Sequence, residues 1–343
     1  MNKKAAVIPG DGIGPEVVGA MLEVLRSCNT GIEIIECEAG SEQWERNGRR
    51  DSTYIPEATS QVLGECGACF KGPTTTIPEP GAPRSVAVTL RQRFELYANV
   101  RPVRTYERIT PGRDLDFVCF REATEGLYAG VESDVGPGAA IAIRKVTRRG
   151  CDRLLDAAAR WAVERGMSRM VAITKRNILK KTDGIFWESA RRAAGAAGLG
   201  VDEIYIDNMA QQMVLRPEQF NGAVLASTNL FMDIISELAS GLAGSIGLIY
   251  SANIGDAFAM FEAAHGSAPD IAGKGAANPA AAILSGAWMA GHLGEPDVRD
   301  AIFSAAEQVI NGGGAVTADI GGSATTSQMS AAIAGAAAAS LRR

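Results

Sequence analysis

Short apolar runs alternate along the chain with longer segments in which apolar residues recur at helical spacing. Residues 3–10 have the length and composition of a buried strand, and residues 15–27 place apolar positions on one helical face. Strands that alternate with helices in this way predict an α/β protein with parallel or mixed sheets. Further strands are expected over 31–38, 68–73, 115–122, 170–175, 202–207 and 222–227, and further helices over 55–66, 151–166, 184–198, 278–294 and 329–343.

Residues 228–242 carry two acidic residues four positions apart, Asp233 and Glu237. A helical repeat of ~3.6 residues places both on one face, where like charges destabilise a helix by roughly 0.2–0.5 kcal/mol. Two interpretations follow: water solvates the acidic face, or a cation binds between the carboxylates. The apolar stripe of this helix is expected on the opposite side, at Phe231, Ile234, Ile235, Leu238 and Leu242.

The composition is that of a globular protein. Its 343 residues are 46% hydrophobic and 21% charged, which is enough for about two domains. A net charge of −5 disfavours broad binding to nucleic acid or anionic membranes. The first residues form no signal-peptide core, and no apolar run is long enough to span a bilayer. We therefore expect a cytoplasmic protein with reduced thiols and no nucleic-acid or membrane partner.

Two motifs match functional patterns only in part. Gly10 and Gly12 follow a strand as in a dinucleotide-binding loop, but Pro15 stands where that fingerprint needs its third glycine. An ordinary Rossmann site is therefore disfavoured. Cys66 and Cys69 have the spacing of a redox or metal pair, but no second pair or nearby His completes a site. Small apolar residues at the start of a strand are the favoured interpretation of these cysteines.

Arg91, Arg101 and Arg121 lie in three separate segments, each near a strand or a turn. Arginine is always charged and binds carboxylates through two parallel hydrogen bonds. Three converging arginines would bind a ligand with two or three carboxylates. The alternative is three unrelated surface arginines, and spacing alone favours that alternative.

Further candidates lie at strand ends and in one small-residue segment. Lys175 and Asp207 each end an expected strand, where α/β active sites gather, although Asp207 could instead cap a helix. Residues 261–279 are rich in small side chains that let the backbone approach a flat ligand. Because the chain has two histidines, any metal should be a hard, oxygen-ligated ion such as Mg²⁺ or Mn²⁺.

Taken together, several segments resemble the β-decarboxylating dehydrogenases, namely isocitrate, homoisocitrate and 3-isopropylmalate dehydrogenases. The resemblance covers nearly the whole chain in the expected order. It implies an α/β fold of two domains with mixed sheets and an interdomain cleft, distinct from a standard Rossmann fold. The segments that carry it are IPGDGIGPEV, KGPTTT, LYANVRP, REATEGLYAG, TKRNILKKTDG, NLFMDIISE, SANIGD, HGSAPDIAGKGAANP and TADIGGSATT.

The resemblance also implies a domain division. A large, cofactor-side domain would combine 1–96 with 248–343, and a small domain over 97–247 would carry the substrate and metal residues and the dimer interface. It implies a homodimer with shared active sites, in which Lys175 and Asp207 reach into the partner's site.

The resemblance assigns roles by position, and the implied activity is NAD-dependent oxidative decarboxylation of a small 2-hydroxy-3-carboxy acid. Catalytic roles fall to Tyr128, Lys175 and Asp207. Substrate contacts fall to Arg84, Ser85, Arg91, Arg101 and Arg121. Mg²⁺ or Mn²⁺ ligands fall to Asp207, Asp233 and Glu237. NAD contacts fall to Thr75, Thr76, Glu262, His265, Gly266, Asp270, Ile271 and Asn278.

Several positions depart from the family pattern, which puts Asp where this chain has Glu237 and Gly where it has Met232. The extra methylene of Glu237 would reshape the metal site, route binding through water or favour Mn²⁺, because Mg²⁺ demands tight octahedral geometry. Arg84 and Ser85 favour isocitrate or homoisocitrate as substrate. The alternatives are 3-isopropylmalate or an unusual malate analogue of specialised metabolism, or a non-catalytic regulatory subunit of a hetero-oligomeric isocitrate dehydrogenase.

Overall fold

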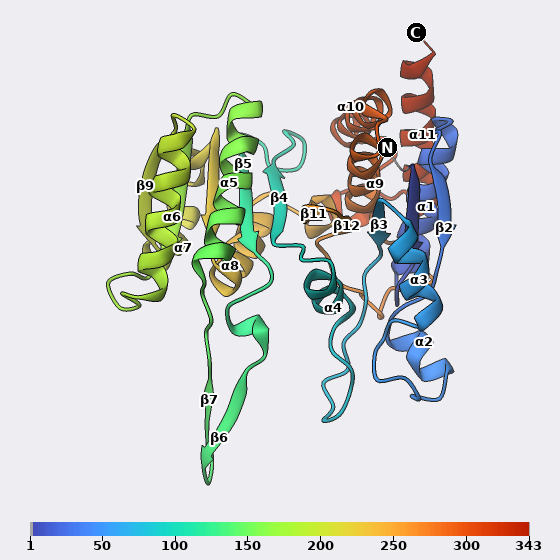
Figure 1. Ribbon diagram of the computed structural model, residues 1–343. Helices are drawn as coiled ribbons and strands as arrows, with labels where there is room; N and C mark the ends of the chain where they lie inside the picture. Colours follow the sequence, from blue (N-terminus) through green and yellow to red (C-terminus); the bar gives the residue numbers. More distant parts are fainter. Residues whose placement is uncertain (1–2, 343) are drawn as a thin grey trace.

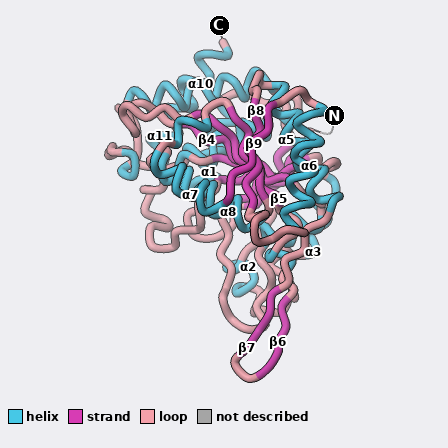
Figure 2. Tube along the Cα trace, turned by 90° about the vertical axis from the view of Figure 1, so that its left-hand side faces the viewer, coloured by secondary structure: helices cyan, strands magenta, loops and turns pink. Residues whose placement is uncertain are grey.

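One mixed sheet of ten strands runs through the protein, in the order β2-β1-β3-β12-β11-β4-β5-β10-β8-β9. The computed structural model describes residues 3–342, so the last residue of the final expected helix lies outside it. Figure 1 shows the strands running across the molecule from β9 to β2, and Figure 2 shows them at the centre with helices around them. The strands are β1 (Lys4–Ile8), β2 (Glu33–Glu36), β3 (Ala68–Lys71), β4 (Ala98–Arg104), β5 (Asp116–Glu122), β8 (Arg169–Thr174), β9 (Gly200–Tyr205), β10 (Ala223–Ser227), β11 (Tyr250–Ile254) and β12 (Ala259–Ala263).

Strand direction changes at the middle of the sheet. The outer strands pair in parallel on both sides, β2-β1-β3-β12 on one side and β5-β10-β8-β9 on the other. Only β11 and β4 are antiparallel to both of their neighbours. The α/β class with a mixed sheet is therefore confirmed, and the expected strands and helices appear at their places in the chain.

Two groups of helices flank the two halves of the sheet. In Figure 1, α1, α9, α10 and α11 lie beside β1–β3, and α5, α6, α7 and α8 lie beside β8–β10. Buried apolar side chains gather in separate clusters within each half, so each half has its own core. The domain bounds 1–96 plus 248–343 and 97–247 stay a prediction. The helices are α1 (Gly14–Ser27), α2 (Ser41–Arg46), α3 (Glu57–Glu65), α4 (Val86–Arg93), α5 (Arg148–Glu164), α6 (Thr182–Ala196), α7 (Ile206–Leu215), α8 (Asn229–Leu242), α9 (Ala280–His292), α10 (Pro296–Gly312) and α11 (Thr326–Leu341), with short 3-10 turns η1 (Leu127–Ala129), η2 (Pro217–Phe220), η3 (Ile246–Leu248) and η4 (Ala318–Ile320).

A hairpin arm extends away from both halves (Figure 1). Its strands β6 (Glu132–Gly136) and β7 (Ala139–Ala142) are antiparallel, and all of their residues are exposed. The exposed side chains include Val135 at 57% and Ile141 at 48%. An isolated two-stranded hairpin is marginally stable in water, and exposed apolar side chains often mark a binding surface. We therefore expect another surface to pack against this arm.

The expected apolar stripe of α8 is correct only in part. Ile235 is buried and Leu238 and Leu242 pack against the core, but Ile234 is 52% exposed. The buried face also includes Met232 and small or polar residues, namely Asn229, Ser236, Ala239 and Ser240. Small side chains let the helix pack closely against the sheet, so the buried face is less apolar than periodicity suggests. As a result, the acidic residues border the buried face and are not opposite to it.

Two smaller findings concern the cysteines and membranes. Cys69 lies in β3 and Cys66 just before it, and both are buried free thiols, as the favoured interpretation expected. Within residues 3–342, no helix is both long and apolar enough to cross a membrane.

Candidate active site

Side chains from both halves of the sheet line one cavity of about 270 Å³. Arg91 of α4, Arg101 of β4 and Arg121 of β5 all reach it, and all three are buried. The alternative of unrelated surface arginines is therefore wrong, because the mixed sheet brings three distant segments to one place. The cavity is also lined by Lys71, Ser85, Tyr128, Asp233, Glu262, His265 and Gly266.

Glu262 of β12 is held between two cations. Its Oε2 lies 2.8 Å from Lys71 Nζ, and its Oε1 accepts a hydrogen bond from Arg91 Nη2 at 2.9 Å. Burial by itself would raise the pKa of Glu262, but the charges of Lys71 and Arg91 hold that pKa well below its usual range. The carboxylate is thus ionised and compensates part of the positive charge. Its expected contact with NAD stays a prediction.

Tyr128 and Arg121 converge on Asp233. The Tyr128 hydroxyl donates to Asp233 Oδ2 at 2.5 Å, and Arg121 Nη1 donates to Asp233 Oδ1. The Arg121 guanidinium lies 4.8 Å above the Tyr128 ring, and its Nε donates to Asn229 Oδ1 at 2.9 Å. Burial raises the pKa of Tyr128, and the hydrogen bond to Asp233 raises it further. The phenol therefore keeps its proton at neutral pH and can act as a proton donor.

Arg101 compensates the second acid of α8. Its Nη1 donates to Glu237 Oε1 at 2.5 Å and to Ser236 Oγ at 3.0 Å, and its Nη2 lies 3.8 Å from Asp233 Oδ1. The two carboxylates are thus balanced by arginines of the sheet. Neither interpretation of the acidic pair, water or a bound cation, included this arrangement.

The α8 carboxylates also bear on metal binding. Asp233 and Glu237 offer oxygen donors, the ligand type that Mg²⁺ and Mn²⁺ prefer. The third expected ligand, Asp207, lies on α7 and contacts Lys175. Within residues 3–342, no group of three or more His, Cys, Asp or Glu is arranged to hold a metal ion. The α8 pair fits such an ion only if further oxygen ligands come from substrate or from a second chain.

Lys175 and Asp207 lie together, but outside this cavity. Lys175 Nζ donates to Asp207 Oδ1 at 2.6 Å, and neither residue is among those that line the cavity. This hydrogen bond lowers the pKa of Asp207. Asp207 belongs to the first turn of α7, whose N-cap is Tyr205, so it is not the cap residue considered from the sequence.

Arg84 and Ser85 lie at the start of α4. Ser85 is the N-cap residue and lines the cavity, whereas Arg84 is exposed. The Arg84 guanidinium lies beside Gly130, the residue that directly follows η1. Of the two, only Ser85 therefore reaches the cavity in this conformation.

The Gly10–Gly12 loop organises the adjoining backbone. Asp11 is buried, and its carboxylate accepts hydrogen bonds from the backbone N–H groups of Ser41, Glu42 and Thr75 at 2.7–3.0 Å. A Cβ on Gly12 would lie 2.1 Å from the Ser267 carbonyl oxygen, at a φ of +61°. The close approach of the loop to Ser267 therefore explains Gly12 without a dinucleotide-binding fingerprint.

The remaining cofactor candidates differ in their surroundings. Thr75 Oγ1 is hydrogen-bonded to Ser267 Oγ at 2.7 Å, and Thr76 is exposed. Asp270 is exposed, and Ile271 packs against the core of the first half. Asn278 donates to Asp319 at 3.0 Å.

His265 offers a buried polar atom that fits a bound cofactor. Its Nδ1 contacts the Gly266 carbonyl at 3.0 Å, while its Nε2 is buried and has no hydrogen-bond partner. Burial lowers the pKa of His265, and the nearby Lys71 lowers it further. A buried polar atom without a partner is rare, so a polar group of a cofactor fits here.

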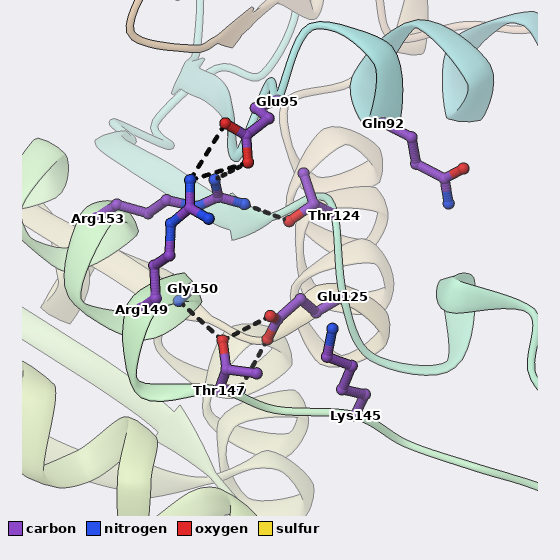
Figure 3. A pocket seen from close by; sticks show the side chains of 9 residues that line it. All are labelled: Gln92, Glu95, Thr124, Glu125, Lys145, Thr147, Arg149, Gly150 and Arg153. Atoms are coloured by element: carbon purple, nitrogen blue, oxygen red, sulfur yellow. Dashed lines mark hydrogen bonds and ion pairs between the residues drawn. The ribbon is translucent and has the colours of Figure 1, made fainter.

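A second cavity of about 290 Å³ lies at the end of α4 (Figure 3). Glu95 pairs there with Arg149 at 3.0 Å and with Arg153 at 3.4 Å. Glu125 accepts hydrogen bonds from both the N–H and the hydroxyl of Thr147. Both acids of this cavity are thus paired, and no expected site residue lines it, so the cavity with three arginines is the stronger candidate.

Comparison with known proteins decides the family. Residues 4–333 match the family described as isocitrate/isopropylmalate dehydrogenase. The chain belongs to this family. It is 40% identical to a 3-isopropylmalate dehydrogenase of Methanothermobacter thermautotrophicus, over 97% of this chain and 98% of that protein. It is 42% identical to an isocitrate/homoisocitrate dehydrogenase of Thermus thermophilus, with the same coverage.

Solved structures agree with this assignment. A crystal structure of isocitrate dehydrogenase from Methylococcus capsulatus superposes with a TM-score of 0.92 at 42% identity, covering 98% of this chain and 99% of that chain. The expected isopropylmalate/isocitrate dehydrogenase-like fold is therefore confirmed. The relatives carry names for several different substrates, so the family alone does not choose among them.

Several polar residues of the site in this member of the isocitrate/isopropylmalate dehydrogenase family were not predicted from the sequence. Lys71, Asn99 and Asn253 are buried and contact the ionised groups described above. The available signal was a polar residue inside a strand that should be fully buried. That signal marks a buried hydrogen bond, but the chain order does not reveal its partner.

Proposed function

We propose that this chain catalyses the NAD-dependent oxidative decarboxylation of a 2-hydroxy-3-carboxy acid, with isocitrate or homoisocitrate favoured. The observation that carries the proposal is the convergence of three buried arginines on one cavity with a tyrosine and two carboxylates. Arginines bind carboxylates strongly, and a polycarboxylate would replace the α8 acids as their partner. The names of the relatives cover the same class of acid.

The substrate preference rests on the start of α4. Ser85 lines the cavity beside Arg91, where a hydroxyl can donate to a third carboxylate. Arg84 is exposed near Gly130, next in sequence to Ser85, and would reach a longer acid by a change of rotamer. Isopropylmalate, with an apolar side chain, would leave these polar groups unpaired, so it ranks second.

In the proposed mechanism, the chain's own residues orient the acid and move protons. Arg91, Arg101 and Arg121 hold its carboxylates in the cavity. Lys175 of a second chain, hydrogen-bonded to Asp207 of that same chain, helps to remove the hydroxyl proton. Tyr128 donates a proton to C3 after carbon dioxide leaves, which agrees with its raised pKa.

The absent groups supply the remaining chemistry. When bound, NAD⁺ would accept the hydride. A hard divalent cation would polarise the hydroxyl and stabilise the negative charge that develops. Asp233 and Glu237, with Asp207 of a second chain, would hold the cation, and His265 and Asp270 would contact NAD. Asp270 favours NAD over NADP because a carboxylate accepts from a ribose hydroxyl but repels a phosphate.

The proposed assembly is a homodimer with shared sites. Lys175 and Asp207 lie outside the cavity of their own chain, and the hairpin arm exposes apolar side chains such as Val135 and Ile141. A second copy that covers the arm and receives Lys175 would explain both features.

A second candidate is a regulatory subunit that binds the acid without turnover. The pairing of Glu237 with Arg101 favours it, because this pairing occupies a substrate arginine. The deciding experiment measures NADH and NADPH formation by the purified chain with isocitrate, homoisocitrate, 3-isopropylmalate and malate, each with Mg²⁺ or Mn²⁺. Turnover with isocitrate or homoisocitrate and NAD⁺ supports the proposal. Binding without turnover across the panel supports the regulatory subunit, and higher turnover with NADP⁺ refutes the role of Asp270.

A further inference from the structure

Two buried amides face each other at the centre of the sheet. Asn99 of β4 and Asn253 of β11 are direct partners in the antiparallel register, and both are fully buried. Asn99 Nδ2 donates to Asn253 Oδ1 at 3.0 Å. These strands are the two at which strand direction changes, so the pair lies between the two halves of the sheet. Burying a polar amide costs free energy unless its hydrogen bonds are satisfied, so the partners of this pair identify what it does.

Each amide holds one arginine of the cavity by the same atom. Asn253 Oδ1 accepts from Arg91 Nε at 2.8 Å, and Asn99 Oδ1 accepts from Arg101 Nε at 3.0 Å. A hydrogen bond at Nε fixes the plane of the guanidinium, because Nε lies at the root of that rigid group. The terminal nitrogens are then the ones directed away from the amides.

Asn253 also controls the partner of Arg91. Its Nδ2 donates to Glu262 Oε1 at 2.7 Å, the same oxygen that accepts from Arg91 Nη2. An amide accepts from the cation through its oxygen and donates to the anion through its nitrogen, two separate atoms of one planar group. An Asp at this position would repel Glu262, and a Leu would leave two buried charges without this bridge. The need to bridge a cation and an anion therefore favours Asn at this position. Packing alone would also allow a Leu of similar size.

We infer that Asn99 and Asn253 form a positioning pair that sets the distance and orientation of Arg91 and Arg101. The pair preorganises two carboxylate-binding groups that come from different elements, so the acid pays little to order them when it binds. This inference rests on the proposed function in one respect, the assignment of Arg91 and Arg101 to substrate carboxylates. It predicts a larger effect on the acid than on the dinucleotide, since Asn253 also contacts Glu262, an expected NAD residue.

The test compares Asn99→Ser, Asn253→Ser and the double variant with the wild type. Ser227→Ala is the matched control, because the buried Ser227 side chain of β10 donates to the Ile173 carbonyl and makes no hydrogen bond to an arginine, although its backbone lies beside Arg121 in the sheet. We expect each Asn variant to raise the KM for the acid about ten-fold or more, as for loss of a hydrogen bond to a charged group. For Asn99→Ser, which changes no hydrogen bond to an expected NAD residue, the KM for NAD should stay within about two-fold, as should kcat. The double variant should cost less than the product of the single effects, because both act through one bridge.

Three outcomes separate the possibilities. An unchanged KM for the acid in folded variants, checked by the thermal unfolding temperature, overturns the inference while leaving the proposed function in place. An equal rise in the KM for NAD also overturns it, because that result indicates general loosening. If the wild type is silent on every acid, the proposed function fails. Calorimetric titration with citrate then decides the inference, which requires weaker citrate binding by both Asn variants than by Ser227→Ala.

Discussion

Lys175 Nζ lies 2.6 Å from Asp207 Oδ1, yet neither side chain lines the cavity that holds the arginines. The catalytic residues expected from the family are therefore divided between two places in one chain. Tyr128 and Asp233 lie at the cavity, and the lysine–aspartate pair lies elsewhere. Such a division has a direct consequence for how inactive variants combine.

We expect two inactive variants to restore activity when they are mixed. In the proposed shared site, Tyr128 comes from one chain and Lys175 from the other. Lys175→Ala and Tyr128→Phe therefore remove groups that different chains contribute. Unfolding and refolding an equal mixture should form heterodimers with one intact site, giving about a quarter of wild-type activity. The NADH assay before and after mixing measures this. If the refolded mixture stays as inactive as its components, the two residues act within one chain.

Tyr128→Phe should lower kcat about 100-fold or more, because general acid catalysis typically contributes 10²–10⁴-fold. The raised pKa of Tyr128 keeps its proton available at neutral pH. The ring and its contact with Arg121 remain, so the KM for the acid should change by less than about three-fold. Steady-state kinetics with the preferred acid provide the measurement. A kcat within ten-fold of wild type would rule out Tyr128 as the proton donor.

Glu237→Asp should raise the ratio of activity with Mg²⁺ to activity with Mn²⁺. The shorter side chain restores the residue that the family pattern has at this position, and it withdraws the carboxylate from Arg101, 2.5 Å away. Mg²⁺ gains more from this change because it demands tighter geometry. Glu237→Gln, which keeps the length but removes the charge, is the matched control and should lower activity with both ions. Complete loss with Glu237→Asp would instead show that Glu237 has a role of its own.

His265 should make the protein less stable as the pH falls. Burial lowers its pKa in the folded state, so between that pKa and the unfolded value of about 6.5 only the unfolded chain takes up a proton. The free energy of unfolding therefore decreases with falling pH in this window, by at most about 1.4 kcal/mol per pH unit from this residue. Urea unfolding at pH 7.5 and 5.5 should show a smaller difference for His265→Asn than for wild type.

His292→Asn is the comparison variant for that experiment. Burial also lowers the pKa of His292, but this side chain is exposed, so its removal should have a smaller effect. Equal slopes for wild type and His265→Asn would contradict the prediction.

The strands of the sheet other than β4, β11 and β12 could be predicted from the sequence, because apolar periodicity is a local property of the chain. The strand over 3–10, the helix over 15–27 and the later pairs all appear, although their bounds shift by a few residues. The helix over 228–242 was also found, but its buried face was misjudged. That face depends on the size of the partner surface, which local periodicity does not contain.

The candidate site shows the same division. Family motifs identified Arg91, Arg101, Arg121, Tyr128 and Asp233, and the fold brings them to one cavity. Spacing alone argued against that convergence, because the three arginines belong to separate segments. The contacts that orient them, through Asn99 and Asn253, were not anticipated.

The sequence by itself determined the α/β class, the family and the set of chemical groups available to the site. Tertiary structure alone decided which groups meet. It placed Glu237 on Arg101, Glu262 between Lys71 and Arg91, and Lys175 away from the cavity. The reason is physical: hydrogen bonds and ion pairs depend on distances of about 3 Å between atoms, and only packing of the whole chain sets those distances.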